Sequence, residues 1–118
     1  LELPWPPSVN GYYRAVKGRA IMSKKGREYK KAAVAAIHQH GFTGQGIAGE
    51  VSVRVNLFPP DRRARDIDNY HKALFDALTT ARVWVDDKQV KELTTIMGYP
   101  TKGGSVRVEI TDPIYRSK

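Results

Sequence analysis

The sequence predicts one α+β domain: a small mixed sheet with two helices packed on one of its faces. Two observations support this prediction. One segment alternates strictly between apolar and polar residues, as strands do, and two others repeat apolar residues at helical spacing. The predicted order is strand, helix, strand, loop, helix, strand and strand, which is typical of an α+β domain. A chain of 118 residues suits a single domain, so we assign residues 1–118 to it.

The start of the chain is predicted to be mostly irregular. Glu2 and Leu3 end a short edge strand, which the following prolines terminate because they lack an N–H donor. Residues 4–18 then form a basic loop that carries aromatic side chains, and residues 19–22 form a short strand.

A long helix and the clearest strand follow. Ser23 is a typical N-cap for a helix over residues 24–40, where apolar residues recur every three or four positions, and Gly41 supplies the C-cap. Residues 51–57 alternate valine or leucine with polar side chains, which indicates a strand with one buried face. Both elements therefore offer an apolar face to a shared core.

The second half of the chain is predicted to add one helix and further strands. A charged loop over residues 61–66 leads to a helix that begins near Asp68 and presents leucines and alanines on one side. Residues 83–85 form a short apolar segment. Residues 93–97 and 106–110 are predicted to pair as a hairpin, because a turn rich in glycine and proline lies between them.

The composition limits what the protein can do. It has no cysteine, which excludes disulfides, thiolate metal sites and cysteine nucleophiles. The longest apolar run, residues 32–37, is too short to cross a bilayer, so we expect no membrane association, no signal peptide and a cytoplasmic location. No phosphate-binding glycine motif is present, so we expect no nucleotide cofactor. The net charge of +8 favours a polyanionic partner such as nucleic acid.

Acidic residues are concentrated in one part of this basic chain, since six of the twelve lie between Asp61 and Asp87. Asp66 and Asp68 stand two apart before the second helix, where an extended backbone would project both to the same side. Asp86 and Asp87 follow the short apolar segment and add a third carboxylate within reach. Each aspartate alone is equally an ordinary cap or turn residue, but the set favours a metal site.

Magnesium is the cation that these ligands indicate. It takes oxygen ligands and keeps positions open for water and phosphate, whereas carboxylates without a cation would repel nucleic acid. Lys72, one helical turn beyond Asp68, is placed to neutralise a phosphate oxygen or a leaving group. An EF-hand is excluded, since the sixth and twelfth positions counted from Asp66 are histidine and alanine. The expected chemistry is metal-assisted hydrolysis of a phosphodiester.

Basic side chains near these carboxylates are candidates for contact with a phosphate backbone. One group immediately precedes the acids, a second belongs to the basic loop near the N-terminus, and a third lies in the late turn. The histidines are expected to be structural, because no cysteine completes a zinc site. The candidate DNA-binding residues of these three groups are Arg62, Arg63, Arg65, Lys17, Arg19 and Lys102.

Several motifs in this order resemble those of a known family. The chain has LPWPPS at residues 3–8, PDRR at 60–63 and RDIDN at 65–69, followed by Lys72 and by WVDDKQV at 84–90. On these motifs the sequence resembles the RusA family of Holliday junction resolvases over nearly its whole length. The motifs most specific to this family are the arginine with its two spaced aspartates, the lysine that follows them, and the later pair of aspartates.

The resemblance implies a homodimeric, magnesium-dependent endonuclease that binds four-way junction DNA and nicks two opposing strands in recombination and repair. Two alternatives stay open. One is an architectural protein that binds junctions without cutting them, and the other is a nuclease that acts on flaps or other branched DNA.

The resemblance also implies roles for individual residues. Asp86 would be a secondary acid, Arg65 and Asn69 would support the site, and Asn69 would also be one of the DNA-binding residues. The metal would be bound by three of the four catalytic residues, and Lys72, the fourth, would act as a base or charge stabiliser. The three implied metal ligands are Asp66, Asp68 and Asp87.

Overall fold

A mixed sheet of four strands forms one layer of the protein, for which a computed structural model describes residues 1–41 and 46–112. The strands are β1 (Glu2–Pro4), β4 (Val51–Phe58), β5 (Val90–Met97) and β6 (Ser105–Thr111). They lie in the order β1-β6-β4-β5. β4 pairs in parallel with β5 and antiparallel with β6, and β6 pairs antiparallel with β1. The mixed sheet predicted from the sequence is therefore confirmed.

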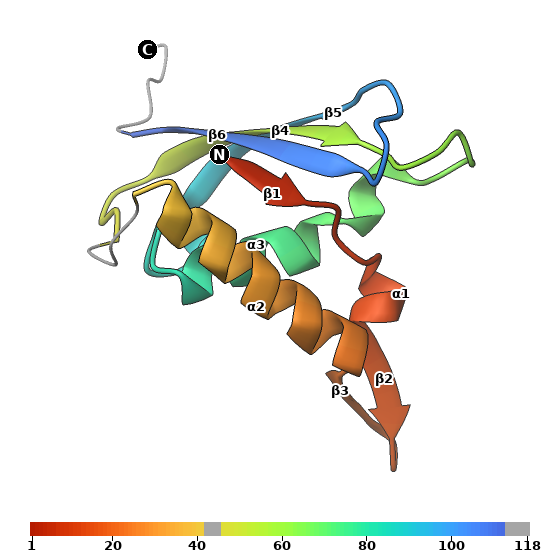
Figure 1. Ribbon diagram of the computed structural model, residues 1–118. Helices are drawn as coiled ribbons and strands as arrows, with labels where there is room; N and C mark the ends of the chain where they lie inside the picture. Colours follow the sequence, from red (N-terminus) through yellow and green to blue (C-terminus); the bar gives the residue numbers. More distant parts are fainter. Residues whose placement is uncertain (42–45, 113–118) are drawn as a thin grey trace.

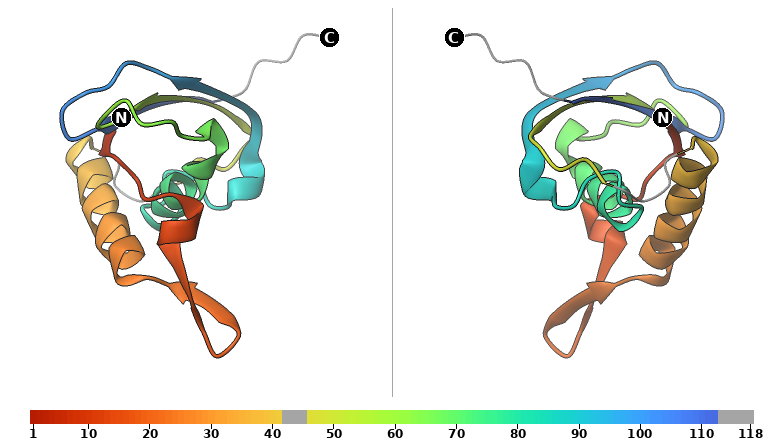
Figure 2. Two further views of the ribbon diagram at one scale, coloured as in Figure 1. Left: turned by 90° about the vertical axis from the view of Figure 1, so that its right-hand side faces the viewer. Right: turned by 90° about the vertical axis from the view of Figure 1, so that its left-hand side faces the viewer.

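Two helices cover one face of this sheet, as predicted. Figures 1 and 2 show α2 (Lys24–Gln39) and α3 (His71–Thr80) lying on the same side of the strands. The alternating apolar residues of β4 are buried beneath them, because successive side chains of a strand point to opposite faces. Over the described ranges, no helix combines the length and hydrophobicity needed to cross a membrane.

The predicted hairpin between residues 93–97 and 106–110 is wrong. These residues lie in β5 and β6, which are separated by β4 and do not pair with each other. β4 has four buried residues, more than either neighbour, and its central place lets both of its edges form hydrogen bonds. The connection over residues 98–104 therefore crosses the end of β4, where the Thr101 N–H donates to the Pro59 carbonyl oxygen at 2.8 Å.

The segment predicted as an irregular loop, residues 4–18, contains regular structure. A one-turn helix, α1 (Val9–Tyr12), begins after Ser8, whose hydroxyl oxygen accepts a hydrogen bond from the Gly11 N–H at 3.3 Å. The described residues thus contain three α-helices, one more than the sequence predicted. The prolines before Ser8 concealed this cap, since they indicate irregular backbone by themselves.

A second, two-stranded sheet follows α1 directly. β2 (Tyr13–Val16) pairs antiparallel with β3 (Arg19–Met22), the short strand that the sequence predicted. The two residues between them have positive φ, 51° at Lys17 and 76° at Gly18. Two left-handed residues in succession make a tight hairpin turn, for which the sequence supplied only the glycine as a signal. Figure 1 shows this hairpin extending away from the main sheet and its helices.

The turn before α3 also differs from the prediction of a helix start near Asp68. A 3₁₀ turn, η1 (Ile67–Asn69), precedes the helix, which begins only at His71. The Asn69 N–H donates to the Asp66 carbonyl oxygen at 3.2 Å and closes the turn. Asp68 therefore does not cap α3, and its side chain is exposed.

Candidate active site

Asp66 and Asp68 lie on the surface at the N-terminal end of α3. The extended backbone predicted across this pair is found only at Asp66, because Asp68 belongs to η1. His71 fixes the turn to the sheet. Its Nε2 lies 2.7 Å from Oγ1 of Thr95 in β5, and its Nδ1 lies 3.5 Å from the carbonyl oxygen of Asp68. The two exposed carboxylates thus belong to a turn that His71 attaches to β5.

Asp87 lies beside the C-terminal end of α3, where two side chains hold its carboxylate. The Thr79 hydroxyl donates a hydrogen bond to Oδ1, and the Trp84 indole N–H lies 3.1 Å from the same oxygen. The indole N–H also lies 2.7 Å from the Thr79 hydroxyl oxygen. Because Trp84 is completely buried, this carboxylate is anchored to the core.

The two carboxylate positions are separated by the length of α3. Thr79 follows His71 by eight positions, which correspond to about 12 Å along a helix axis. In the part of the chain that the structure describes, no group of three or more histidine, aspartate or glutamate side chains is close enough to hold a metal ion. Carboxylate oxygens are the ligands that magnesium prefers, so the chemistry of these three side chains fits a magnesium site. Their spacing does not, because Asp66 and Asp68 lie at one end of the helix and Asp87 lies at the other.

A row of aromatic rings connects these two ends. The Phe75 ring lies between the other two, with centroid distances of 6.0 Å to His71 and 5.5 Å to Trp84. Both pairs are arranged edge to face, which is a favourable geometry for aromatic rings. These three packed rings therefore cover the side of α3 that lies between the two carboxylate positions.

Lys72 is paired with a residue that sequence reasoning did not select as part of the site. Its Nζ lies 3.1 Å from Oδ1 of Asp76, one helical turn further along α3. The pair is partly shielded from water, since 44% of the Lys72 side chain and 21% of the Asp76 side chain are exposed. The hydrogen bond to the Asp76 carboxylate raises the pKa of Lys72 above its ordinary value. The spacing of four residues was the signal available in the sequence.

Two tyrosines from the segment predicted as a loop pack near this pair. Tyr12 is completely buried, and its ring meets that of Tyr13 edge to face at 5.1 Å. Burial, and then the neighbouring Asp76 carboxylate, raise the pKa of Tyr12 above its ordinary value. Among the described residues, none makes a well-formed hydrogen bond with the Tyr12 hydroxyl. Tyr12 therefore belongs to the core and offers no ring face to a nucleic acid base.

Asp86, the predicted secondary acid, caps a turn. It precedes the 3₁₀ turn η2 (Asp87–Gln89), and its Oδ1 accepts a hydrogen bond from the Lys88 N–H at 2.9 Å. The Gln89 side chain accepts in return from the Asp86 N–H at 2.9 Å, which completes a capping box. The carboxylate nevertheless remains exposed. In the short apolar segment before it, the backbone of Trp84 forms an isolated β-bridge with Ile47.

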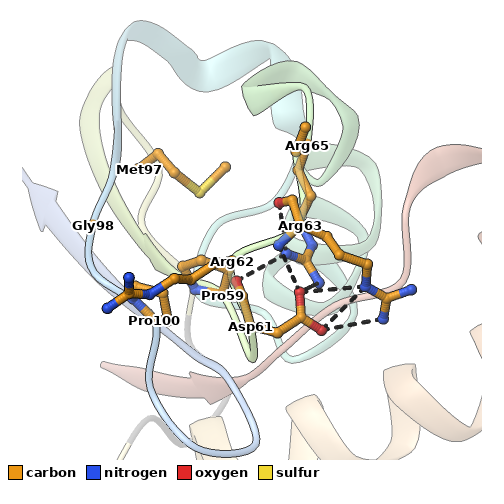
Figure 3. Close-up of a pocket in the computed structure, with 9 residues that line it drawn as sticks. Pro59, Asp61, Arg62, Arg63, Arg65, Met97, Gly98 and Pro100 are labelled. Carbon is orange, nitrogen blue, oxygen red and sulfur yellow. Dashed lines mark hydrogen bonds and ion pairs between the residues drawn. The ribbon is translucent and has the colours of Figure 1, made fainter.

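The arginines before the first acid pair have unequal roles in the loop after β4 (Figure 3). Asp61 Oδ1 lies 2.8 Å from Nη2 of Arg65, and Asp61 Oδ2 lies 3.1 Å from Nη2 of Arg63. Arg65 also donates to the carbonyl oxygens of Asp61 and Arg63, at 3.1 Å each, and lies 5.7 Å from the centroid of the Trp5 ring. Only 12% of the Arg65 side chain is exposed, against 81% for Arg63. Arg65 therefore braces the loop, and Arg63 faces solvent.

An open cavity of about 350 Å³ lies between this loop and the one that follows β5 (Figure 3). The hydrogen bond from Thr101 to Pro59 ties the two loops together. Arg62 and Arg63 line the cavity, and Lys102 is exposed in the second loop. These three cations are thus gathered at one end of the main sheet.

Lys17 and Arg19 occupy a different place. Both are exposed on the β2–β3 hairpin, which Figure 1 shows apart from the loops at the end of the sheet. Asn69 is half-buried in η1, where its backbone closes the turn between the two exposed carboxylates and α3. The cations predicted to contact DNA, which come from three parts of the sequence, therefore form two groups in space.

Comparison with known proteins gives one consistent result. A family model described as Endodeoxyribonuclease RusA matches residues 4–111. The crossover junction endodeoxyribonuclease RusA of Escherichia coli strain K12 is 44% identical over 112 residues, which cover 95% of this chain and 92% of that protein. Proteins of the same name from Enterobacteria phage 82 and from Shigella sonnei strain Ss046 are 44% and 43% identical over the same shares of both chains.

Proposed function

Since the chain belongs to the RusA family of endodeoxyribonucleases, we propose that it resolves Holliday junctions by hydrolysing phosphodiester bonds in DNA. The structural observation that most supports this function is the exposed pair Asp66 and Asp68, which lies between a cationic loop and Lys72 in a chain of net charge +8. Exposed carboxylates weaken the binding of a polyanion unless a cation neutralises them. A protein that only bound junctions would gain nothing from this pair.

The cation that we propose is Mg²⁺, with Asp66, Asp68 and Asp87 as its ligands. Asp66 and Asp68 already lie at the same end of α3, whereas Asp87 lies at the other end and would have to move to join them. Bound to these carboxylates, it would polarise the scissile phosphate and make a water molecule a better nucleophile. The donor set supports this choice, because all three side chains supply hard oxygen ligands. Thr79 and Trp84 orient the Asp87 carboxylate through their hydrogen bonds, as outer partners of metal ligands do.

Lys72 and the exposed cations have separate roles in this proposal. Lys72 neutralises charge that develops on a phosphate oxygen or on the leaving group. Arg65 and Asn69 support the site by holding the loop and the turn that carry the acids, and Asp86 is a secondary acid beside Asp87. The side chains that hold the DNA backbone without reading its sequence are Arg62, Arg63, Lys102, Lys17 and Arg19.

We further propose that the protein acts as a homodimer in the cytoplasm. One copy of the chain carries one set of candidate catalytic residues, and two symmetric nicks require two. A two-fold dimer also matches the two-fold symmetry of a four-way junction. A body with extents of 43 × 34 × 30 Å spans only part of such a junction by itself.

The test of this function is the cleavage of an end-labelled four-way junction in the presence of Mg²⁺, beside a linear duplex and a flap of the same sequence. Paired nicks on opposing strands of the junction alone are the expected result. Tight binding without cutting would favour an architectural protein, and preferential cutting of the flap would keep the chemistry but overturn the substrate.

Asp68→Asn is the matched control for this experiment. It keeps the shape of an exposed side chain and removes its charge, so we expect cutting to be abolished while junction binding persists or tightens. Cutting by this variant near the unsubstituted rate would show that Asp68 does not bind the catalytic metal.

A further inference from the structure

The ion pair on the exposed side of α3 joins a proposed catalytic residue to one with no assigned role. Lys72 Nζ and Asp76 Oδ1 are 3.1 Å apart. Asp76 has no part in the proposed metal site, and its side chain is only 21% exposed. A carboxylate with this little access to water is placed for a contact within the protein rather than for solubility.

The surroundings of Asp76 hold it from the other side. α1 packs against α3 and brings the buried Tyr12 beside the carboxylate. The Tyr12 ring is in turn locked by Tyr13, and the Tyr12 carbonyl oxygen accepts a hydrogen bond from the Ser23 N–H at 2.9 Å. The corner between α1 and β2 is thus tied to the start of α2. Asp76 is therefore partly buried beside α1, whereas the Lys72 side chain is more exposed to solvent.

We propose that Asp76 is a positioning residue, which holds the ammonium of Lys72 where it meets the phosphate; this inference rests on the role proposed for Lys72 in phosphodiester cleavage. A lysine has a long flexible side chain and a point charge without preferred direction. A fixed carboxylate one helical turn away removes most of that freedom before the substrate binds. Such preorganisation raises kcat without tightening the binding of the substrate.

The contact with Asp76 also favours one protonation state of the Lys72 side chain. A neighbouring carboxylate favours the ammonium over the neutral amine. Between the two roles left open by the sequence, base or charge stabiliser, the Lys72–Asp76 pair supports the charge stabiliser.

A second lysine–carboxylate pair with the same spacing lies on an exposed helix surface and serves as a comparison. Lys24 and Glu28 also stand four residues apart, on α2, but their nearest atoms are 3.9 Å apart. Their side chains are 83% and 67% exposed. Pairs of this kind contribute little to stability. Glu28→Gln is therefore the matched control for the loss of a carboxylate opposite a lysine.

The first experiment measures kcat and KM for junction cleavage by Asp76→Asn and Asp76→Glu. For Asp76→Asn we expect kcat to fall about ten- to a hundredfold while KM changes by less than about twofold. Asp76→Glu keeps the charge and should recover part of the rate, and Glu28→Gln should cut as the unsubstituted chain does. A loss of rate shared equally by Asp76→Glu and Asp76→Asn would overturn the proposal, because it would show that the charge is not what matters.

The second experiment combines Asp76→Asn with Lys72→Ala. If Asp76 acts through Lys72, its substitution causes no further loss once the ammonium is gone. A loss of the same factor in both backgrounds would assign Asp76 a function of its own and would contradict the proposal.

The third experiment does not depend on cleavage. The ¹⁵N relaxation of the Lys72 ammonium, assigned by its disappearance in Lys72→Arg, reports the mobility of this group. We expect it to be restrained in the unsubstituted chain and in Glu28→Gln, and mobile in Asp76→Asn. If the protein cut no junction but showed this restraint, the proposed function would fail and the positioning contact would stand. An ammonium equally mobile with and without Asp76 would refute the positioning contact, and Asp76→Glu supplies the comparison should Asp76→Asn not fold.

Discussion

At the residue scale, neighbouring side chains of the same type have different functions because their burial differs. Arg62, Arg63 and Arg65 are equivalent in the sequence, and all three were predicted to contact DNA. In the structure Arg65 has most of its guanidinium donors directed to Asp61 and to backbone carbonyl oxygens. The other two arginines are exposed. The resemblance to the family had already given Arg65 a supporting role, and its contacts give that role a physical cause.

The contacts of Arg65 predict a difference in stability between two conservative substitutions. Arg65→Lys should lower the free energy of unfolding by about 1–2 kcal/mol, because one ammonium cannot replace a planar donor that serves a carboxylate and two carbonyl oxygens. Arg62→Lys should leave it unchanged. Urea denaturation of both variants is the measurement, and an equal stability of the two would contradict a bracing role.

Asp61 predicts how stability depends on pH in the acid range. Hydrogen bonds from Arg63, and then the contact with Arg65, hold the pKa of Asp61 well below its usual range in the folded state. This contribution is complete above the ordinary aspartate pKa of about 4 and is lost as the pH falls through the lower folded-state value. Between about pH 5 and pH 2, the unsubstituted chain should therefore lose more stability than Asp61→Asn. Parallel stability curves for the two proteins would exclude this contribution.

At the element scale, the sequence predicted those elements whose pattern is local. The helix over residues 24–40 and the strand over 51–57 were identified from spacing alone, since each pattern records one buried face. The order of the strands in the sheet could not be predicted from such local patterns. β5 and β6 are joined by a turn-like segment, and only the competition for the two edges of β4 places them apart. The same limit hid Asp76, because its role depends on α1 packing against α3.

The contact between α1 and α2 predicts an unusual response to a helix substitution. Glycine to alanine inside a helix usually stabilises by about 1 kcal/mol. A Cβ on Gly26 would lie 2.6 Å from the Tyr12 carbonyl oxygen and 3.0 Å from Cγ of Met22, so the helices would have to separate. We expect Gly26→Ala to destabilise the protein by about 1–3 kcal/mol, measured by thermal or urea unfolding. Lys25→Ala at the exposed neighbouring position serves as the control and should change little.

At the scale of the whole molecule, the exposed cations predicted to contact DNA occupy two separate places. One is the end of the main sheet, where two loops carry Arg62, Arg63 and Lys102, and the other is the β2–β3 hairpin with Lys17 and Arg19. The candidate acids lie at the two ends of α3, and Asp66 and Asp68 directly follow the loop that carries Arg62 and Arg63. A ligand that meets all three regions is extended and polyanionic, and a DNA arm has this form. In the proposed function, the positive charge of the chain therefore directs DNA binding, and the carboxylates carry out the cleavage chemistry.

This division predicts how binding responds to salt. If six to ten phosphates are neutralised, junction affinity should fall by about 10³ to 10⁵ between about 50 and 200 mM salt, because each contact releases condensed counterions. The measurement is the dissociation constant of a labelled junction across that range, without Mg²⁺ so that no strand is cut. Lys17→Gln and Arg62→Gln should each reduce the slope of the double-logarithmic plot by about one. Lys31→Gln, on α2 and outside both groups, should leave the slope unchanged. If only Arg62→Gln lowered the slope, the hairpin would be excluded from the DNA interface, and an affinity nearly independent of salt would remove the electrostatic basis for both groups.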